Sequence, residues 1–151
     1  MIDVRIQKNK FSLIDLLDLQ TPSSHGAQSV FSGIVRNHNH GKKVLGVSYD
    51  AFAPLAHKEF EKICREAQAR FGSDLQIQLW HRIGRLDVGD LSVAIIVSSK
   101  HRDEAFKANR YIIEELKNRA PIWKMEHYED GNSAWLKGHA LCSHSNESLN
   151  V

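Results

Sequence analysis

Apolar residues alternate with polar residues, or follow one another without interruption, at several places that predict β-strands. In residues 2–6 and again in residues 75–79 every second residue is apolar, which is typical of a strand with one buried face. Residues 91–97 form a nearly unbroken apolar run that predicts a central strand. Residues 122–127 predict a further short strand, and residues 134–136 are expected to pair briefly after a turn.

A spacing of three and four between apolar residues predicts two long helices, over residues 54–72 and from about residue 102 to a point before Pro121. Ser12 and Asp15 form a capping-box pattern, which predicts the start of a short helix near the N-terminus. The expected buried positions of the long helices are Leu55, Phe60, Ile63, Cys64, Ala67 and Phe71 in the first, and Ala105, Phe106, Ile112, Ile113 and Leu116 in the second.

The segment FSGIVRNHNHG, residues 31–41, places donor side chains directly after an apolar run. Residues 30–35 predict a buried strand, which delivers Arg36 and His38 into the loop that follows. Residues 45–51 alternate again and are expected to pair with this strand as a hairpin. The loop is open to two interpretations, a plain polar loop or part of a binding site.

Strands outnumber helices and mostly follow one another in pairs, so we expect an α+β fold with a largely antiparallel sheet rather than a doubly wound α/β fold. The chain has 151 residues, of which 42% are hydrophobic and 25% charged, as in an ordinary globular protein. We expect one domain over residues 1–137 and a flexible polar tail over residues 138–151.

Charge and cysteine content favour a cytoplasmic protein. The formal net charge is only +2, from 20 basic and 18 acidic residues, which is too small to indicate nucleic acid without a clustered patch. Cys64 and Cys142 lack metal-ligand or redox spacing, and the N-terminus has no apolar signal region. No apolar run is long enough to cross a bilayer, so we expect no membrane association.

Cations collect at three element ends, where sites are often built. Arg36 follows one strand, Lys100 to Arg102 precede the second long helix, and Lys117, Arg119 and Lys124 surround its other end. A phosphate at the helix start would be favoured by the free N–H groups there, although a solvated basic turn is the plainer interpretation. We predict that Arg36, His101, Arg102, Lys117 and Lys124 converge around one anion in the folded protein.

Lys117 lies at the margin of the apolar stripe, next to Leu116, so its stem should be buried and its ammonium partly desolvated. Desolvation and nearby cations favour the neutral amine, which acts as a nucleophile or general base. The alternative is an ordinary cation in the last turn of a helix. Lys124 shares a strand face with Glu126 and is either catalytic or simply its salt-bridge partner.

Other chemistries are less well supported. His38 and His40 form an HxH pair, but no third ligand has a persuasive spacing, and His139, Cys142 and His144 fall in the polar tail. No nucleophile elbow, P-loop or dinucleotide-binding motif is present, and no hydrolytic triad is visible in the sequence.

Four segments in order, FSGIVRNHNHG, LWHRIGRLDVGD, SSKHRDEAF and LKNRAPIWKME, resemble the MoaE family, the large catalytic subunit of molybdopterin synthase. The resemblance covers about residues 27–137. It implies an α/β hammerhead fold with an additional antiparallel β-subdomain and a homodimer within a heterotetramer. It also implies a small ubiquitin-like sulfur carrier, whose C-terminal Gly-Gly thiocarboxylate supplies sulfur to cyclic pyranopterin monophosphate. The product is the dithiolene of molybdopterin, and no metal or organic cofactor is needed.

The resemblance assigns catalysis to Lys117 and Lys124. It assigns substrate binding to Ile34, Val35, Arg36, His101, Arg102, Lys117, Lys124, Met125 and Glu126. The sequence departs from the family pattern at Ser32 and Ile122, where the family often has Thr and Phe. Some relatives also place an arginine from the neighbouring subunit where this chain has His139, and Lys137 is the possible substitute.

Two rival functions remain open. A single-stranded RNA-binding module would use the cations for phosphates and Tyr49, Trp80 or Trp123 for stacking bases. A non-catalytic scaffold would bind the ubiquitin-like partner without transferring sulfur.

Overall fold

The computed structural model describes residues 1–17 and 21–136 of the chain. The elements are β1 Ile2–Gln7, α1 Leu13–Leu17, β2 Ala27–Ile34, β3 His38–Asn39, β4 Lys42–Ala51, α2 Ala53–Phe71, β5 Gln76–Arg82, β6 Gly84–Asp87, β7 Leu91–Ser99, α3 Arg102–Arg119, β8 Ile122–Tyr128 and β9 Trp135–Leu136.

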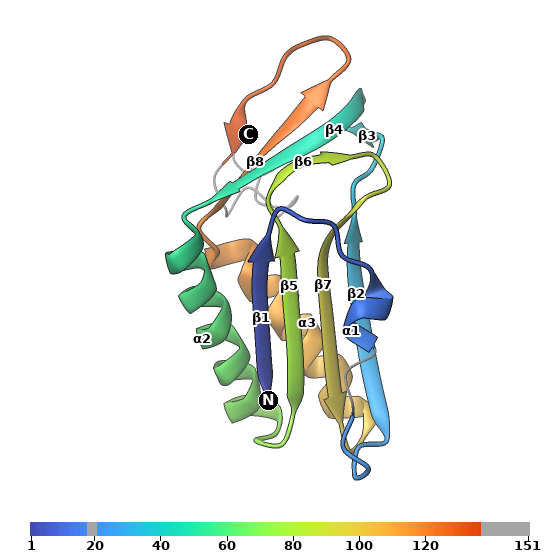
Figure 1. Cartoon of the computed structure of the whole chain (residues 1–151), viewed down its shortest axis with the longest axis vertical. Coiled ribbons are helices and arrows are strands. Elements are labelled where there is room, and N and C mark those ends of the chain that lie inside the picture. The colour runs from blue at the N-terminus through green and yellow to red at the C-terminus, as the bar shows by residue number, and fades with distance from the viewer. Residues whose placement is uncertain (18–20, 137–151) are drawn as a thin grey trace.

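The first sheet has the strand order β1-β5-β7-β2, with β1 parallel to β5 and the other neighbours antiparallel. Helices α2 and α3 cover one face of this sheet, and the short helix α1 lies on the other (Figure 1). The side chains of β5 and β7 are buried almost throughout, because both faces of these central strands are covered. This explains the apolar run in residues 91–97.

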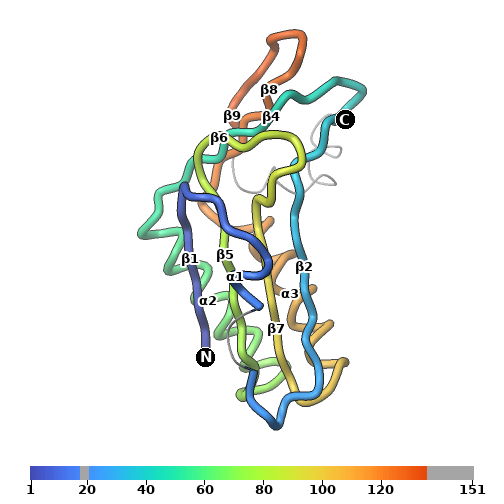
Figure 2. Tube along the Cα trace, turned by 45° about the vertical axis from the view of Figure 1, so that its right-hand side comes forward, coloured from blue at the N-terminus to red at the C-terminus, as the bar shows by residue number. Residues whose placement is uncertain are grey.

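The second sheet lies across the ends of the first (Figures 1 and 2). It has the order β3-β4-β8-β9, and β6 also pairs with β4, all antiparallel. Val35, Val44, Val47 and Leu86 form a small apolar core beneath it. The α+β class and the additional antiparallel sheet are therefore confirmed.

The predicted hairpin between residues 30–35 and residues 45–51 is wrong. Strand β2 pairs with β7, and the loop after it forms its own hairpin, β3–β4, in which His40 and Gly41 have φ of 51° and 75°. Because β2 is an edge strand, it is not the buried strand expected: Val30 is 44% and Ile34 51% exposed. Strand β2 forms hydrogen bonds with the central strand β7 along its whole length, which gives a longer ladder than a local hairpin would.

Both long helices are confirmed, and each has one misassigned position. Phe60, Ile63, Cys64 and Ala67 of α2 are fully buried, but Leu55 is 51% exposed. In α3, Ala105, Ile112, Ile113 and Leu116 face the sheet, whereas Phe106 is 65% exposed, since it lies about 100° around the helix from Ala105. Helix α3 ends at Arg119, and the next residue, Ala120, is extended because it precedes Pro121.

The short helix begins with the predicted capping box, in which Ser12 N donates to Asp15 Oδ2 (2.8 Å) and Asp15 N to Ser12 Oγ (3.4 Å). Within residues 1–17 and 21–136, no helix combines the length and apolar character needed to cross a membrane. The predicted tail, residues 138–151, lies outside the described residues.

Candidate anion-binding cavity

A cavity of about 210 Å³ opens where the first sheet meets the second. Its wall includes residues that follow β2, the last turn of α3 and one face of β8. Among the predicted site residues, the following line it: Ile34, Val35, Arg36, Lys117, Lys124 and Glu126. We call it the cationic cavity, because Arg36 comes to it from the loop after β2, Lys117 from α3 and Lys124 from β8.

Alternation along β8 decides which of its residues face the cationic cavity. Lys124 and Glu126 are two positions apart and share one face, so both line the wall, whereas Met125 between them does not. The geometry therefore supports the predicted placement of Lys124 and Glu126. Met125 was assigned to substrate contact with them, but it lies on the other face of the strand.

Glu126 is a buried carboxylate held by several donors. Its side chain is 6% exposed, it lies 2.9 Å from Lys124 Nζ, and Asn39 Nδ2 donates to both of its oxygens at 2.9 Å. Burial opposes its ionisation, but the Lys124 charge and the hydrogen bonds outweigh this and lower the pKa of Glu126. The carboxylate therefore stays charged and fixes the Lys124 ammonium in the cavity wall.

Arg36 and Lys117 differ in exposure. Arg36 is exposed, and its Nη2 lies 3.5 Å from Asn39 Oδ1, at the outer limit of a hydrogen bond. Lys117 is half-buried in the last turn of α3, as its position at the edge of the apolar stripe predicts. With one carboxylate facing three cations, the cavity suits an anion such as phosphate.

The cavity also contains His81, to which the sequence analysis gave no role. His81 is 3% exposed, and its Nδ1 donates to the carbonyl of Arg82 at 2.6 Å, which leaves the lone pair on Nε2. Its ring packs edge-on against Tyr49, 5.0 Å between centroids. Burial, assisted by the charge of Lys117, lowers the pKa of His81 to about 4. The imidazole is therefore neutral at pH 7 and can accept a proton or hydrogen bond.

Asn39, Tyr49 and Ser92 also line the cavity without having been singled out for it. Burial raises the pKa of Tyr49, and the Ser92 hydrogen bond only partly offsets this, so its hydroxyl stays protonated. One signal was available for His81: it is the first titratable side chain after the apolar positions of the strand that contains Leu75 and Ile77. Asn39 had no such signal, because the local hairpin that positions it was not predicted.

His101 and Arg102 do not line the cavity. They lie at the start of α3, and fifteen residues at 1.5 Å each place Arg102 about 22 Å along the helix from Lys117. The prediction that all five basic residues converge within one chain is therefore wrong for these two. Helix α3 runs along the first sheet, and its C-terminal end lies toward the second sheet while its N-terminal end lies at the far end of the first (Figure 1), so two residues of one helix need not lie at the same site.

Two further candidates, Lys137 and His139, lie outside the described residues. Among the residues that the structure does describe, no group of three or more His, Cys, Asp or Glu side chains is arranged to hold a metal ion.

Comparison with known proteins gives a consistent family. The family described as MoaE protein matches residues 6–119. The molybdopterin synthase catalytic subunit of Synechococcus elongatus is 52% identical over 118 residues, covering 78% of this chain and 72% of that protein. The subunit of the same name from Pyrococcus abyssi is 41% identical over 128 residues, covering 85% of each chain.

Solved structures agree. Molybdopterin synthase from Staphylococcus aureus has a TM-score of 0.81 at 35% identity, covering 87% of this chain and 94% of that one. A complex of subunits 1 and 2 of molybdopterin-converting factor from Helicobacter pylori contains a chain with a TM-score of 0.70 at 25% identity, covering 89% of this chain and 90% of that one. Since the family match extends over most of the chain and the fold agrees as well, this chain belongs to the MoaE protein family.

Proposed function

We propose that this chain is the catalytic large subunit of molybdopterin synthase, a sulfurtransferase of molybdenum cofactor biosynthesis. Its relatives from Synechococcus elongatus and Pyrococcus abyssi are named as that subunit. The observation that carries the proposal is the meeting around one cavity of Arg36, from the loop after β2, with Lys117 of α3 and Lys124 of β8. Three cations face one carboxylate, Glu126, in this cavity, so a bound anion would offset the remaining repulsion among them.

The substrates we propose are cyclic pyranopterin monophosphate and the C-terminal thiocarboxylate of a small ubiquitin-like carrier. The Helicobacter pylori relative is described as a complex of two different subunits, which supports a protein partner. A Gly-Gly terminus has no side chains, so an extended carrier tail of this kind suits a narrow entrance. Two sulfurs are transferred in succession to the pterin side chain.

Within this scheme Arg36, at the exposed edge of the cavity, binds the phosphate of the pterin. Lys117 and Lys124 assist proton transfer as the thiocarboxylate sulfur attacks a side-chain carbon of the pterin and displaces an oxygen from it. They also stabilise the oxyanion that forms when water hydrolyses the resulting thioester, which leaves the sulfur on the pterin and a carboxylate on the carrier. Glu126 keeps Lys124 in place, and the neutral His81 offers a hydrogen-bond acceptor on the cavity wall. Substrate contact by Ile34 and Val35, which line the cavity, remains a prediction, as does the absence of a cofactor.

His101 and Arg102 fit this scheme only if two large subunits associate. We propose a homodimer, within a heterotetramer that includes two carriers, in which His101 and Arg102 of one subunit serve the cavity of the other. Both side chains are exposed at the start of α3, too far from their own cavity to reach a substrate in it. The proposed place of action is the cytoplasm.

The rival function of RNA binding is disfavoured, because aromatic side chains that it would need are buried. RNA binding would need accessible aromatic faces for base stacking, but Trp80 is 4% exposed and packs against Phe11 at 5.5 Å between ring centroids. Tyr49 packs edge-on against His81 in the same way.

The test is reconstitution. The purified chain is incubated with thiocarboxylated carrier and cyclic pyranopterin monophosphate, and the dithiolene product is measured. We expect product only when all three components are present. Carrier that ends in an ordinary carboxylate is the matched control and should give none. Carrier binding without any product would favour the scaffold function and overturn the proposal.

A further inference from the structure

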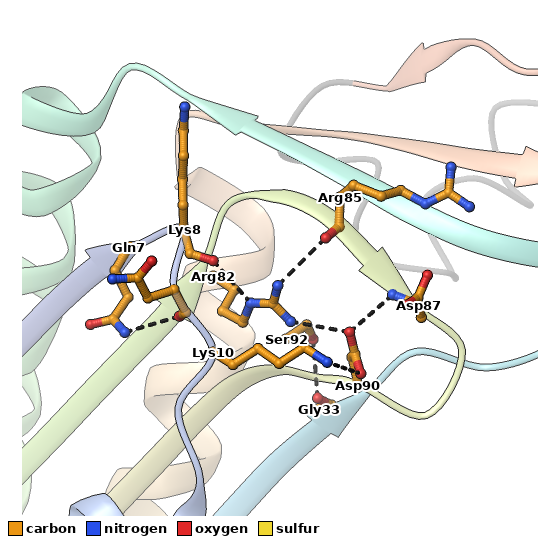
Figure 3. Close-up of polar contacts among 10 residues, drawn as sticks. Gln7, Lys8, Lys10, Gly33, Arg82, Arg85, Asp87, Asp90 and Ser92 are labelled. Atoms are coloured by element: carbon orange, nitrogen blue, oxygen red, sulfur yellow. Dashed lines mark hydrogen bonds and ion pairs between the residues drawn. The ribbon is translucent and has the colours of Figure 1, made fainter.

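Arg82, the last residue of β5, has a side chain that is 7% exposed, and each of its guanidinium nitrogens has an acceptor (Figure 3). Nη1 donates to Asp90 Oδ2 at 3.2 Å. Nε donates to the carbonyl of Lys8 at 3.4 Å and Nη2 to that of Arg85 at 3.5 Å. One side chain therefore joins the loop after β1, the strand β6 and the turn before β7.

Asp90 closes that turn. Its Oδ2 accepts the backbone N–H of Asp87 at 3.0 Å, and its own N–H donates to the Asp87 carbonyl at 3.0 Å. Gly89, between them, has φ of 89°, which suits glycine. The Asp87 N–H, followed by the bond from Arg82, lowers the pKa of Asp90, so the carboxylate is charged at neutral pH. Lys10 Nζ adds a longer contact of 3.6 Å to Oδ1.

The closed turn holds the residue that precedes Arg36. Val35 N donates to the Asp90 carbonyl at 3.0 Å, and Gly89 N donates to the Val35 carbonyl at 2.8 Å. These bonds continue the β2–β7 ladder beyond the register shift between Gly33 and Ile34. At the edge of the cationic cavity, the backbone is therefore positioned by the turn rather than by strand β7.

We propose that the Arg82–Asp90 ion pair is a positioning device for Arg36, which keeps the cation aligned with the phosphate of the substrate. The proposal rests on the proposed function, in which Arg36 binds that phosphate. Arg36 is exposed and its contact with Asn39 is long, so its placement depends on its backbone. Arg82 and Asp90 touch no substrate and act only through Val35.

The competing interpretation is that the buried pair merely stabilises the fold. The two interpretations can be distinguished by a double variant, because replacing both partners of a buried ion pair by neutral groups of similar shape often leaves the stability of the fold unchanged. A purely structural pair predicts an unchanged KM in such a double variant. A positioning device predicts a raised KM for the pterin even when stability is kept, because uniform binding is lost.

The experiment compares Asp90→Asn and the double variant Arg82→Met/Asp90→Asn with a control double variant, Arg65→Met/Glu61→Gln. The control removes an exposed pair of α2 that is 3.4 Å long and distant in sequence from the turn. KM and kcat are measured for cyclic pyranopterin monophosphate with thiocarboxylated carrier. In parallel, hydrogen exchange is measured at the backbone amides of Val35 and Gly89 in the substrate-free protein.

We expect both Asp90 variants to raise KM about tenfold, which corresponds to about 1.4 kcal/mol, with kcat within about twofold of the parent. The Val35 and Gly89 amides should exchange faster, and the control should match the parent protein. The proposal is overturned if KM is unchanged, whether or not exchange accelerates, or if neither Asp90 variant folds, which would make the pair structural.

Failure of the proposed function gives a different result. The unsubstituted protein would then form no product, while faster exchange at Val35 and Gly89 in the variants would still show that the pair holds this backbone. Unchanged exchange in folded variants would overturn the positioning role independently of activity.

Discussion

His81 and Glu126 are both buried in the wall of the cationic cavity, but their surroundings keep His81 neutral and Glu126 ionised. Glu126 has an ammonium and several donors around it, and it stays ionised. His81 has the Arg82 carbonyl on Nδ1 and aromatic rings nearby, and it stays neutral. The cavity thus combines fixed charges with an uncharged acceptor, an arrangement suited to proton transfer beside an anion.

The neutral state of His81 predicts a loss of stability in acid. Its pKa is about 4 in the folded chain, below the ordinary value of about 6.5. Between these values the unfolded chain binds the proton and the folded chain does not, so stability is full above about pH 6.5 and falls as pH drops toward 4. The difference corresponds to about 3 kcal/mol of unfolding free energy. Glu126, whose pKa is lowered, adds its own loss at lower pH.

Denaturant unfolding of the parent and of His81→Asn, measured from pH 7 to pH 4, checks this. Asparagine keeps a donor for the Arg82 carbonyl but does not titrate. The free energy of unfolding of the variant should therefore fall much less than that of the parent between pH 7 and pH 4. Ile77→Val, a fully buried change on the same strand, is the control that lowers stability and keeps the parent slope. An equally steep fall in His81→Asn would show that His81 is not the cause.

At this scale, charged residues at element ends were predictable and buried polar residues were not. Arg36, Lys117 and Lys124 follow directly from a cation beside an apolar pattern. His81 and Asn39 depend on where the second sheet lies relative to β5, which only long-range pairing determines.

Helix α3 is the element that orients the site, because Lys117 projects from its last turn. Asn109 in the middle of the helix is 5% exposed, and its Nδ2 lies 3.0 Å from the Ser29 carbonyl and 3.2 Å from the Ile95 carbonyl. One amide group therefore fixes the helix to both β2 and β7.

Asn109→Ala should lower the free energy of unfolding by about 2 kcal/mol, because it leaves buried acceptors without their donor. The measurement is the denaturant midpoint, which should shift without a change in the slope m. Arg110→Ala is the matched neighbour: Arg110 is exposed and forms an ion pair with Glu114 on the same helix, so its loss should cost about 0.3–0.5 kcal/mol. Equal effects for the two variants would refute the anchoring role.

The helices and strands with a clear apolar periodicity were predicted with nearly correct bounds. The pairing of the strands was not predicted correctly. The apolar spacing of α2 and α3 and the turn before β7 are local properties. Strand β2 pairs with β7 across 57 to 72 residues of sequence, from the pair Ile34 and Leu91 to the pair Ala27 and Ser99, and a local pattern does not determine which of several possible strands is the partner. The register shift between Gly33 and Ile34, shortly before Arg36, has no local signal apart from the glycine.

At the scale of the whole molecule, the two ends of α3 imply that one chain does not complete the proposed site. Lys117 lies at the cavity, whereas Arg102 lies at the opposite end of the helix. If each cavity combines Lys117 of one subunit with Arg102 of the other, two inactive chains should complement each other.

Arg102→Ala and Lys117→Ala chains are co-expressed with different tags, and the mixed dimer is purified through both. One of its two cavities then has both residues intact, so we expect about half of the parent activity. Each variant alone should be nearly inactive. A mixed dimer as inactive as the single variants would show that each cavity takes both residues from the same subunit. Sedimentation as a monomer would exclude a site shared between subunits.

The most direct test of the cationic cavity as the site of sulfur transfer is dithiolene formation by Lys117→Ala, measured together with carrier binding. We expect product formation to fall by at least about a hundredfold, because Lys117 acts on the reacting groups, while carrier affinity and fold are kept. Lys117→Arg should also fail, since arginine keeps the charge but does not deprotonate near neutrality. Lys107→Ala, an exposed lysine of the same helix, should retain parent activity. Parent-like product formation by Lys117→Ala would contradict the account.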